Sequence, residues 1–227
     1  MFVMFTLMAG NAALAQTSAS VMLVSDYRYR GVALSDDHPQ VQMSLAYDNP
    51  DGWYAGVFAS DTRHEYIHGA QLISYAGYAR RYSSTVSWES GASTAHFLQQ
   101  ARYNYTEAYV GLSSENFSAR MYFSPQYFGQ NLRSLYTEIN GAFPLKEHVK
   151  MLAHVGYLRP VGDQDGAGAR ISSRVDTKLG LSFTIADWNA QLAWVRLVRD
   201  QSQPSPYAES HPDRKPRSLV FSLSYIF

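Results

Sequence analysis

Apolar and polar side chains alternate along most of this chain. In residues 219–227, every second position is large and apolar, and Ser222 and Ser224 stand between them. Residues 39–48, 148–159 and 172–184 repeat the pattern. Because successive side chains of a strand point to opposite faces, a period of two predicts strands with two unlike faces.

The alternation predicts twelve strands, at residues 20–30, 39–48, 52–60, 70–79, 83–94, 103–113, 117–125, 133–142, 148–159, 172–184, 188–198 and 217–227. The connections alternate in length. The long ones are 31–38, 61–69, 95–102, 126–132, 160–171 and 199–216, and the short ones are 49–51, 80–82, 114–116, 143–147 and 185–187. Long loops at one rim and tight turns at the other are typical of an up-and-down antiparallel β-barrel.

A soluble barrel or sandwich would show the same alternation with its apolar face turned inward, so other signals must place that face. Aromatic residues gather near the strand ends, as a membrane girdle requires: Tyr27, Tyr29, Tyr47, Trp53, Tyr54, Trp88, Tyr157, Trp188, Trp194 and Tyr225. Strands of about ten residues suffice to cross a bilayer at a tilt. We therefore predict an all-β transmembrane up-and-down barrel of about 12 strands, closed because lipid leaves no backbone group unpaired.

The first residues have the composition of an export signal. Residues 1–15 are apolar from Phe2 to Met8 and end on small residues, with Ala13 and Ala15 in the positions that signal peptidase prefers. A basic start is missing, so the alternatives are a longer signal that begins before Met1, or a short anchor. We predict a signal peptide at 1–15, a barrel at 16–227 and a location in the cell outer membrane.

The composition limits the kinds of molecule that the protein is expected to bind. The chain has 19 Lys+Arg, 19 Asp+Glu and no Cys in 227 residues. Balanced charge gives no reason to expect nucleic acid, and the lack of Cys excludes disulfides and thiolate metal sites. We expect outer-membrane lipids and small hydrophilic solutes as partners, and no cofactor; the oligomeric state stays open.

The polar face carries the candidate site, a set of charged residues on the predicted lumen face: Asp26, Arg28, Arg30, Glu107, Glu138, Lys150, His154, Asp176 and Lys178. They could form a constriction that selects solutes by charge and size, or they could pair with one another and fill the interior. Twelve strands enclose more room than eight and less than sixteen, so a narrow or plugged pore is expected.

Two loop motifs raise the question of chemistry. The sequence His64-Glu65-Tyr66-Ile67-His68 matches the zinc-binding pattern H-E-x-x-H, yet that pattern acts on a helix and needs a third ligand, whereas this pentad falls in a predicted loop. An ordinary polar loop is the simpler interpretation. Asp36-Asp37-His38 is interpreted in the same way, with a cation or acid–base site as the alternative. We predict no catalytic residues.

Several short segments rich in tyrosine and glycine recur along the chain: SDYRYRG at 25–31, GWYAG at 52–56, YAGY at 75–78, YTEAYVG at 105–111, FSPQYF at 123–128, YTE at 136–138 and HVGY at 154–157. In this order they resemble the TorF family of porins from Gram-negative outer membranes. The resemblance implies an outer-membrane β-barrel channel whose substrate is not defined. The chain departs from the family at Gln71 and Ile73, where acidic residues are expected, and around His96.

These observations lead to three functional hypotheses. The first is a passive, narrow channel for small hydrophilic solutes, with no chemical step. The second is a non-conducting barrel whose loops 160–171 and 199–216 bind a partner. The third, a barrel hydrolase, lacks a G-x-S-x-G or similar motif.

Overall fold

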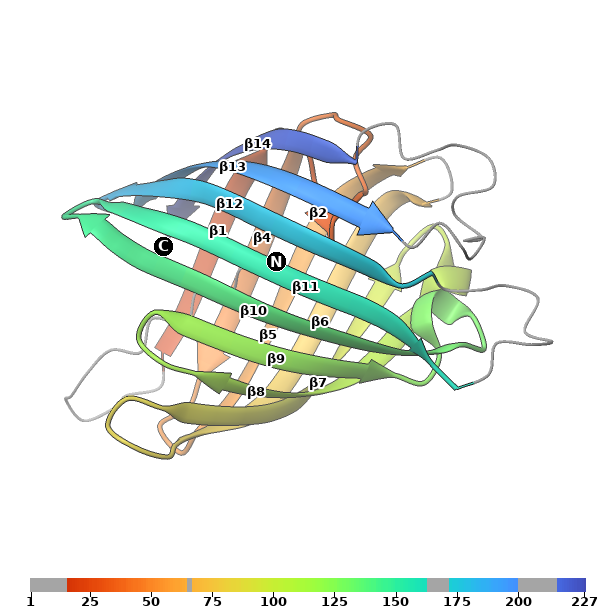
Figure 1. Cartoon of the computed structure of the whole chain (residues 1–227), viewed down its shortest axis with the longest axis horizontal. Coiled ribbons are helices and arrows are strands. Elements are labelled where there is room, and N and C mark those ends of the chain that lie inside the picture. The colour runs from red at the N-terminus through yellow and green to blue at the C-terminus, as the bar shows by residue number, and fades with distance from the viewer. Residues whose placement is uncertain (1–15, 65–66, 163–171, 200–215) are drawn as a thin grey trace.

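The computed structural model describes residues 16–64, 67–162, 172–199 and 216–227. Within them the chain forms a closed antiparallel barrel of twelve strands (Figure 1). These are β1 (Gln16–Val24), β4 (Gln40–Asp48), β5 (Trp53–His64), β6 (Ile67–Arg81), β7 (Ser87–Phe97), β8 (Tyr105–Ser113), β9 (Phe117–Ser124), β10 (Arg133–Lys146), β11 (Val149–Val161), β12 (Arg174–Ile185), β13 (Trp188–Arg199) and β14 (Arg217–Ile226). Each strand pairs with the next, and β14 pairs with β1 to close the wall. The predicted all-β up-and-down barrel is confirmed.

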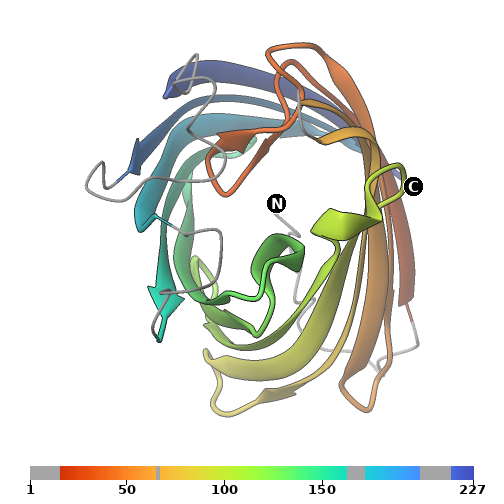
Figure 2. The same cartoon turned by 90° about the vertical axis from the view of Figure 1, so that its right-hand side faces the viewer.

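The first predicted strand, 20–30, is wrong at its end. Strand β1 stops at Val24, and residues 25–39, here called the plug segment, fold into the barrel (Figure 2). There β2 (Arg28–Tyr29) and β3 (Val32–Ala33) form a hairpin with Arg30 and Gly31 as its turn. Both turn residues have positive φ, 50° and 77°, which is the geometry of a tight type I′ hairpin. Alternation continues through this segment because a small hairpin has the same period as a wall strand.

The predicted nine-residue connection 61–69 is also wrong. Strand β5 runs through His64 and β6 begins at Ile67, with Arg63 paired to His68. Asp61 and Arg63 are exposed while Thr62 is buried, so strand geometry continues after the apolar residues have ended. The other described connections between wall strands keep the predicted contrast: 98–104 and 125–132 are longer, and 49–52, 82–86, 114–116, 147–148 and 186–187 are shorter.

The outer surface of the barrel is apolar. Large side chains such as Met43, Leu179 and Leu219 are exposed along the strands, at 56%, 56% and 64%. Of the aromatic residues expected at the surface, several are indeed exposed: Tyr47, Trp53, Trp88, Tyr157, Trp188 and Trp194. Tyr27 and Tyr54 are instead buried, and Tyr29 lies in the plug segment. No helix in the described ranges is long and apolar enough to cross a membrane.

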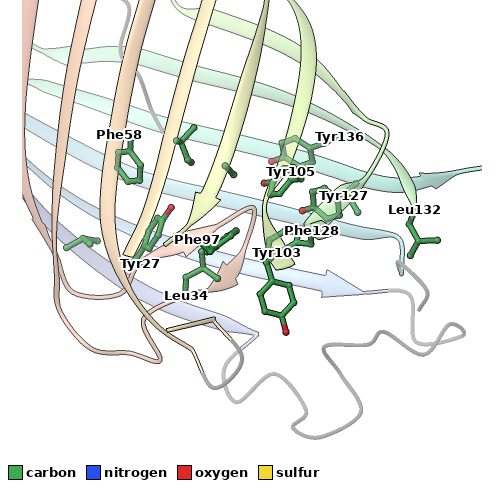
Figure 3. Packing of buried hydrophobic residues seen from close by; sticks show 14 residues of the cluster. Tyr27, Leu34, Phe58, Phe97, Tyr103, Tyr105, Tyr127, Phe128, Leu132 and Tyr136 are labelled. Carbon is green, nitrogen blue, oxygen red and sulfur yellow. The ribbon is translucent and has the colours of Figure 1, made fainter. Parts of the chain in front are cut away.

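A buried aromatic cluster lies inside the barrel at the end where the long connections lie (Figure 3). The plug segment contributes Tyr27 and Leu34, and two short 3₁₀ turns, η1 (Ala101–Tyr103) and η2 (Tyr127–Gly129), contribute residues of their own. The ring of Phe128 stacks on Phe97 and on Tyr105 at centroid distances of 5.7 and 5.0 Å. The long connections therefore pack inward at this end.

Candidate functional site in the barrel interior

Part of the interior wall is built from tyrosines that lie across glycines. On β5 and β6, Tyr54 is paired in register with Gly77, and Gly56 with Tyr75. A Cβ atom added at Gly77 would lie 2.5 Å from the Tyr54 hydroxyl oxygen, so only glycine leaves room for the ring. The same relation joins Tyr109 to Gly91 on β8 and β7. The repeated Tyr-x-Gly segments thus place flat aromatic rings along the wall.

The plug segment begins with its own ion pair. The Arg28 guanidinium donates to Asp26 over 2.5 Å, with both side chains buried, and Asp26 also accepts a bond from Ser35. The Tyr27 hydroxyl donates to Oε1 of Gln71 on β6 over 2.6 Å. Burial raises the pKa of the Tyr27 phenol well above its ordinary value, so the hydroxyl stays protonated. The resemblance to the TorF family leads one to expect an acidic residue at position 71. The amide of Gln71 accepts the bond from Tyr27 without adding a buried charge.

Arg30, at the tip of the hairpin, is a buried cation. Its guanidinium donates two parallel bonds to Glu107 on β8, at 2.8 and 2.6 Å, and the side chains are 6% and 3% exposed. Its Cζ atom lies 4.2 Å from the centre of the Tyr136 ring and 5.1 Å from that of Tyr122. Breaking such a buried pair by removing one partner costs about 3–5 kcal/mol.

A second charged cluster lies on the wall of β7, β8 and β9. Arg120 contacts Glu89 through Nε at 2.5 Å and through a terminal nitrogen at 3.2 Å. The Tyr54 hydroxyl donates to the same carboxylate at 2.8 Å and contacts the Tyr109 hydroxyl at 2.8 Å. The ion pair is therefore continuous with the tyrosine wall.

A third cluster joins β10, β11 and β12. His154 contacts Asp176 through Nε2 at 2.8 Å and Asn140 through Nδ1 at 2.6 Å. The Tyr136 hydroxyl donates to Asp176 at 3.2 Å. Tyr136 therefore touches this cluster with its hydroxyl while its ring lies under Arg30.

The structure thus brings most of the sequence-predicted charges together as partners. Asp26 joins Arg28, Arg30 joins Glu107, and Asp176 joins His154. Three remaining residues occupy the same wall. Glu138 accepts a 3.4 Å bond from Tyr122, Lys178 lies opposite His154 in the strand register, and Lys150 lies opposite Ser182.

Sequence reasoning missed Glu89, Arg120 and Arg174. Arg120 shares the face of Ser118 and Tyr122, and Glu89 that of Ser87 and Gly91, so the alternation itself marked both as interior positions. Arg174 donates to the hydroxyl of Tyr127 at 2.7 Å. That contact joins β12 to a loop, and strand periodicity carries no signal for it.

Of the two loop motifs, the second reaches the interior charges through one residue, because Oδ1 of Asp37 lies 3.9 Å from a terminal nitrogen of Arg28. His64 ends β5 and His68 lies on β6, where its Nδ1 contacts Gln100, while Glu65 lies outside the described residues. Asp36, Asp37 and His38 are exposed near the C-terminal end of the plug segment. Within the described ranges, no group of three or more His, Asp or Glu side chains could hold a metal ion.

A protein-family model described as a bacterial protein of unknown function, Gcw_chp, matches residues 8–224. The chain belongs to the Gcw_chp family. No curated protein sequence matches it. The short TorF-like segments therefore fall within a Gcw_chp chain, and family membership by itself assigns no activity.

Solved structures of porins share the fold of this Gcw_chp chain. The NanC porin aligns with a TM-score of 0.60 and 12% identity, over 91% of this chain and 98% of its own. The KdgM porin gives 0.59 and 12%, over 92% and 99%. KdgM porin in complex with disordered oligogalacturonate gives 0.56 and 9%, over 94% and 99%. At such low identities the similarity shows a shared barrel architecture alone. Each alignment covers almost the whole of this chain and of the porin.

Proposed function

We propose that this protein is an outer-membrane channel through which small hydrophilic solutes diffuse passively along a narrow, charged lumen. The observation that carries the proposal is the distribution of the protein's side chains, which is the reverse of that in a soluble barrel. Large apolar residues are exposed around the barrel, and ion pairs such as Arg30–Glu107 and Arg120–Glu89 are enclosed within it. A soluble barrel would have the opposite arrangement, because exposed apolar area on this scale drives association in water.

The closed wall supports the same proposal. Lipid offers no partner to a backbone N–H or C=O, so a membrane-crossing sheet must have no free edge, and pairing of β1 with β14 removes it. An even number of antiparallel strands is the pattern of single-chain barrels of bacterial outer membranes. Residues 1–15 would then serve as the signal peptide that exports the barrel 16–227, and the TorF-like segments agree with this location.

We assign the selection of solutes to the charged residues of the interior wall. Charges that line a narrow passage raise the local concentration of solutes of opposite sign and exclude the others. The assigned set is Asp26, Arg28, Arg30, Glu107, Glu138, Lys150, His154, Asp176 and Lys178.

Recording from planar bilayers tests the channel directly. The refolded protein should give discrete current steps that scale with salt concentration. Neutralising Arg28 or Glu107 should shift the reversal potential measured across a salt gradient, because each change alters the charge of the lumen. Absence of current steps over a range of voltage and salt, from the wild type and from variants that lose the Arg30–Glu107 pair, with protein shown to be inserted, would remove the channel assignment.

A non-conducting barrel is the second candidate, and the buried cluster at one end of the barrel favours it. Tyr27, Leu34, Phe97 and Phe128 are all buried in one cluster there. In this alternative the loops that include 163–171 and 200–215, which lie outside the described residues, would bind an external partner. Deleting them should then abolish binding and leave the barrel folded.

A further inference from the structure

We propose that the plug segment, residues 25–39, is the gate of this barrel and that the Arg30–Glu107 ion pair is the latch that holds it shut. The inference rests on the proposed channel function. It identifies the segment that closes the passage and the contact that must break before the passage opens.

The plug segment reaches across the lumen. The Tyr27 side chain is bonded to Gln71 on β6 and the Arg30 side chain to Glu107 on β8. Gly31 lies against the opposite part of the wall, since a Cβ atom there would be 2.7 Å from Cβ of Asp176 on β12. Strands β6 and β12 stand far apart in the barrel order, so the segment that touches both must span the interior (Figure 2).

Side chains, rather than backbone ladders, hold the hairpin tip in place. Within the described residues, the backbone bonds that join the segment to the wall flank the hairpin, one before β2 and one directly after β3. Ser25 N–H donates to the Phe221 carbonyl at 2.8 Å, and Arg63 N–H donates to the Leu34 carbonyl at 2.7 Å. Strands β2 and β3 pair only with each other. The tip can therefore move without opening the barrel wall.

The backbone conformation of this turn disfavours arginine at position 30, whereas the contacts of the arginine side chain favour it. Position one of a type I′ turn needs positive φ, which favours Asn, Asp or Gly, and Arg adopts it at a cost in strain. In return the guanidinium gains two bonds to Glu107 and contact with the rings of Tyr136 and Tyr122. Tyr29, beside Arg30, adds one neutral bond, which its hydroxyl accepts from Tyr105 on β8 at 2.9 Å. The charged contacts gather on the Arg30 side chain, so loss of that side chain should loosen the tip.

Two latch variants and a matched control test the proposal in planar bilayers. Arg30→Ala removes the cation, and Glu107→Gln keeps the shape of its partner while removing the charge. Each should increase the fraction of time in the conducting level at least about tenfold, since losing a buried pair shifts such an equilibrium strongly. Arg133→Ala, which removes an exposed arginine at the start of β10, should match the wild type.

A reversible crosslink tests the movement of the plug segment directly. The Arg30–Glu107 ion pair stays intact in this experiment. The chain has no cysteine, so the double variant Gly31→Cys with Leu197→Cys holds one possible disulfide. Gly31→Cys alone is the control for the crowding of a side chain there, since its Cβ atom would lie 2.7 Å from Cβ of Asp176. A Cβ atom at position 31 would lie 3.3 Å from Cβ of Leu197, close to the roughly 3.8 Å that a disulfide spans. The oxidised protein should stay in a low-conductance level, and reductant should restore openings. Wild-type currents should not respond to reductant.

Labelling of a buried cysteine reports gate opening without any current. The Leu34 side chain is 1% exposed in the plug segment, and Leu34→Cys leaves its backbone bonds in place. A thiol reagent should modify this cysteine about tenfold faster, or more, when Arg30→Ala is also present, because the side chain is accessible only when the segment moves.

The outcomes separate the gate from the channel. If the wild type conducts but the latch variants, the oxidised crosslink and the labelling rate all equal their controls, the gate is wrong and the channel stands. If the wild type, the latch variants and the reduced crosslink all fail to conduct, the channel is wrong. Labelling then decides whether the segment moves, and an unchanged rate overturns the gate as well.

Discussion

At the scale of single residues, the tyrosine–glycine pairs explain why short Tyr-x-Gly segments recur. A side chain at Gly77 would collide with the Tyr54 hydroxyl and with the Ser90 carbonyl oxygen, at 2.5 and 2.6 Å. We predict that Gly77→Val lowers the free energy of unfolding by about 1–3 kcal/mol, because the ring must leave its place on the wall. Urea unfolding in lipid vesicles, followed by tryptophan fluorescence, measures the change.

The neighbouring position provides the control for that substitution. Ala76 precedes Gly77 on β6 and is exposed on the outer face. Ala76→Val should therefore change the unfolding free energy by less than about 0.5 kcal/mol. Equal effects at the two positions would contradict the assignment of rings to the inner face.

At the scale of elements, the hairpin of β5 and β6 decides the meaning of the H-E-x-x-H match. Zinc binding by this pattern needs both histidines on one face of a helix, one turn apart. Here His64 ends one strand and His68 belongs to the next. We predict that zinc binds the purified protein no more tightly than about micromolar, as measured by competition with a chromogenic chelator.

Histidine variants show whether any zinc binding depends on His64 and His68. His64→Ala and His68→Ala should leave the weak residual binding unchanged, because adventitious surface binding depends on no single residue. Tight binding that both substitutions abolish would show that the hairpin rearranges into a metal site.

At the scale of the whole molecule, the orientation of the barrel faces can be tested with two leucines of nearly equal exposure. Leu179 lies in the middle of β12 and Leu145 near the end of β10, and they are 56% and 55% exposed. In a bilayer, Leu179→Arg should destabilise by about 2–4 kcal/mol and Leu145→Arg by about 0–1 kcal/mol, because the cost of a charge depends on its depth.

A soluble barrel would give a different result for the same pair. Water surrounds both positions in that case, so the two arginines should have equal and small effects. Solubility offers a second measurement: the chain without residues 1–15 should need detergent or lipid, and a monodisperse sample in plain buffer would contradict the membrane assignment.

The interior site was predictable in part, and the limits follow from particular residues. Glu107 and Asp176 could be assigned to the lumen because each shares a face with polar neighbours along its strand. Arg30 could not be assigned to a plug, since Asp26, Arg28 and Arg30 alternate with Tyr27 and Tyr29 as a wall strand would. The partner of Arg30 lies 77 residues away, and no local pattern identifies it.

Local alternation was enough to establish the strands, their two unlike faces and the antiparallel order, because each is a property of neighbours along the chain. It could not show where β1 ends, that residues 25–39 turn inward, or which charges meet across the lumen. Those features arise only when β14 joins β1, because closure creates an interior that a strand, a turn or a hairpin does not have by itself. Charges distant in sequence then have to find partners there, away from bulk water.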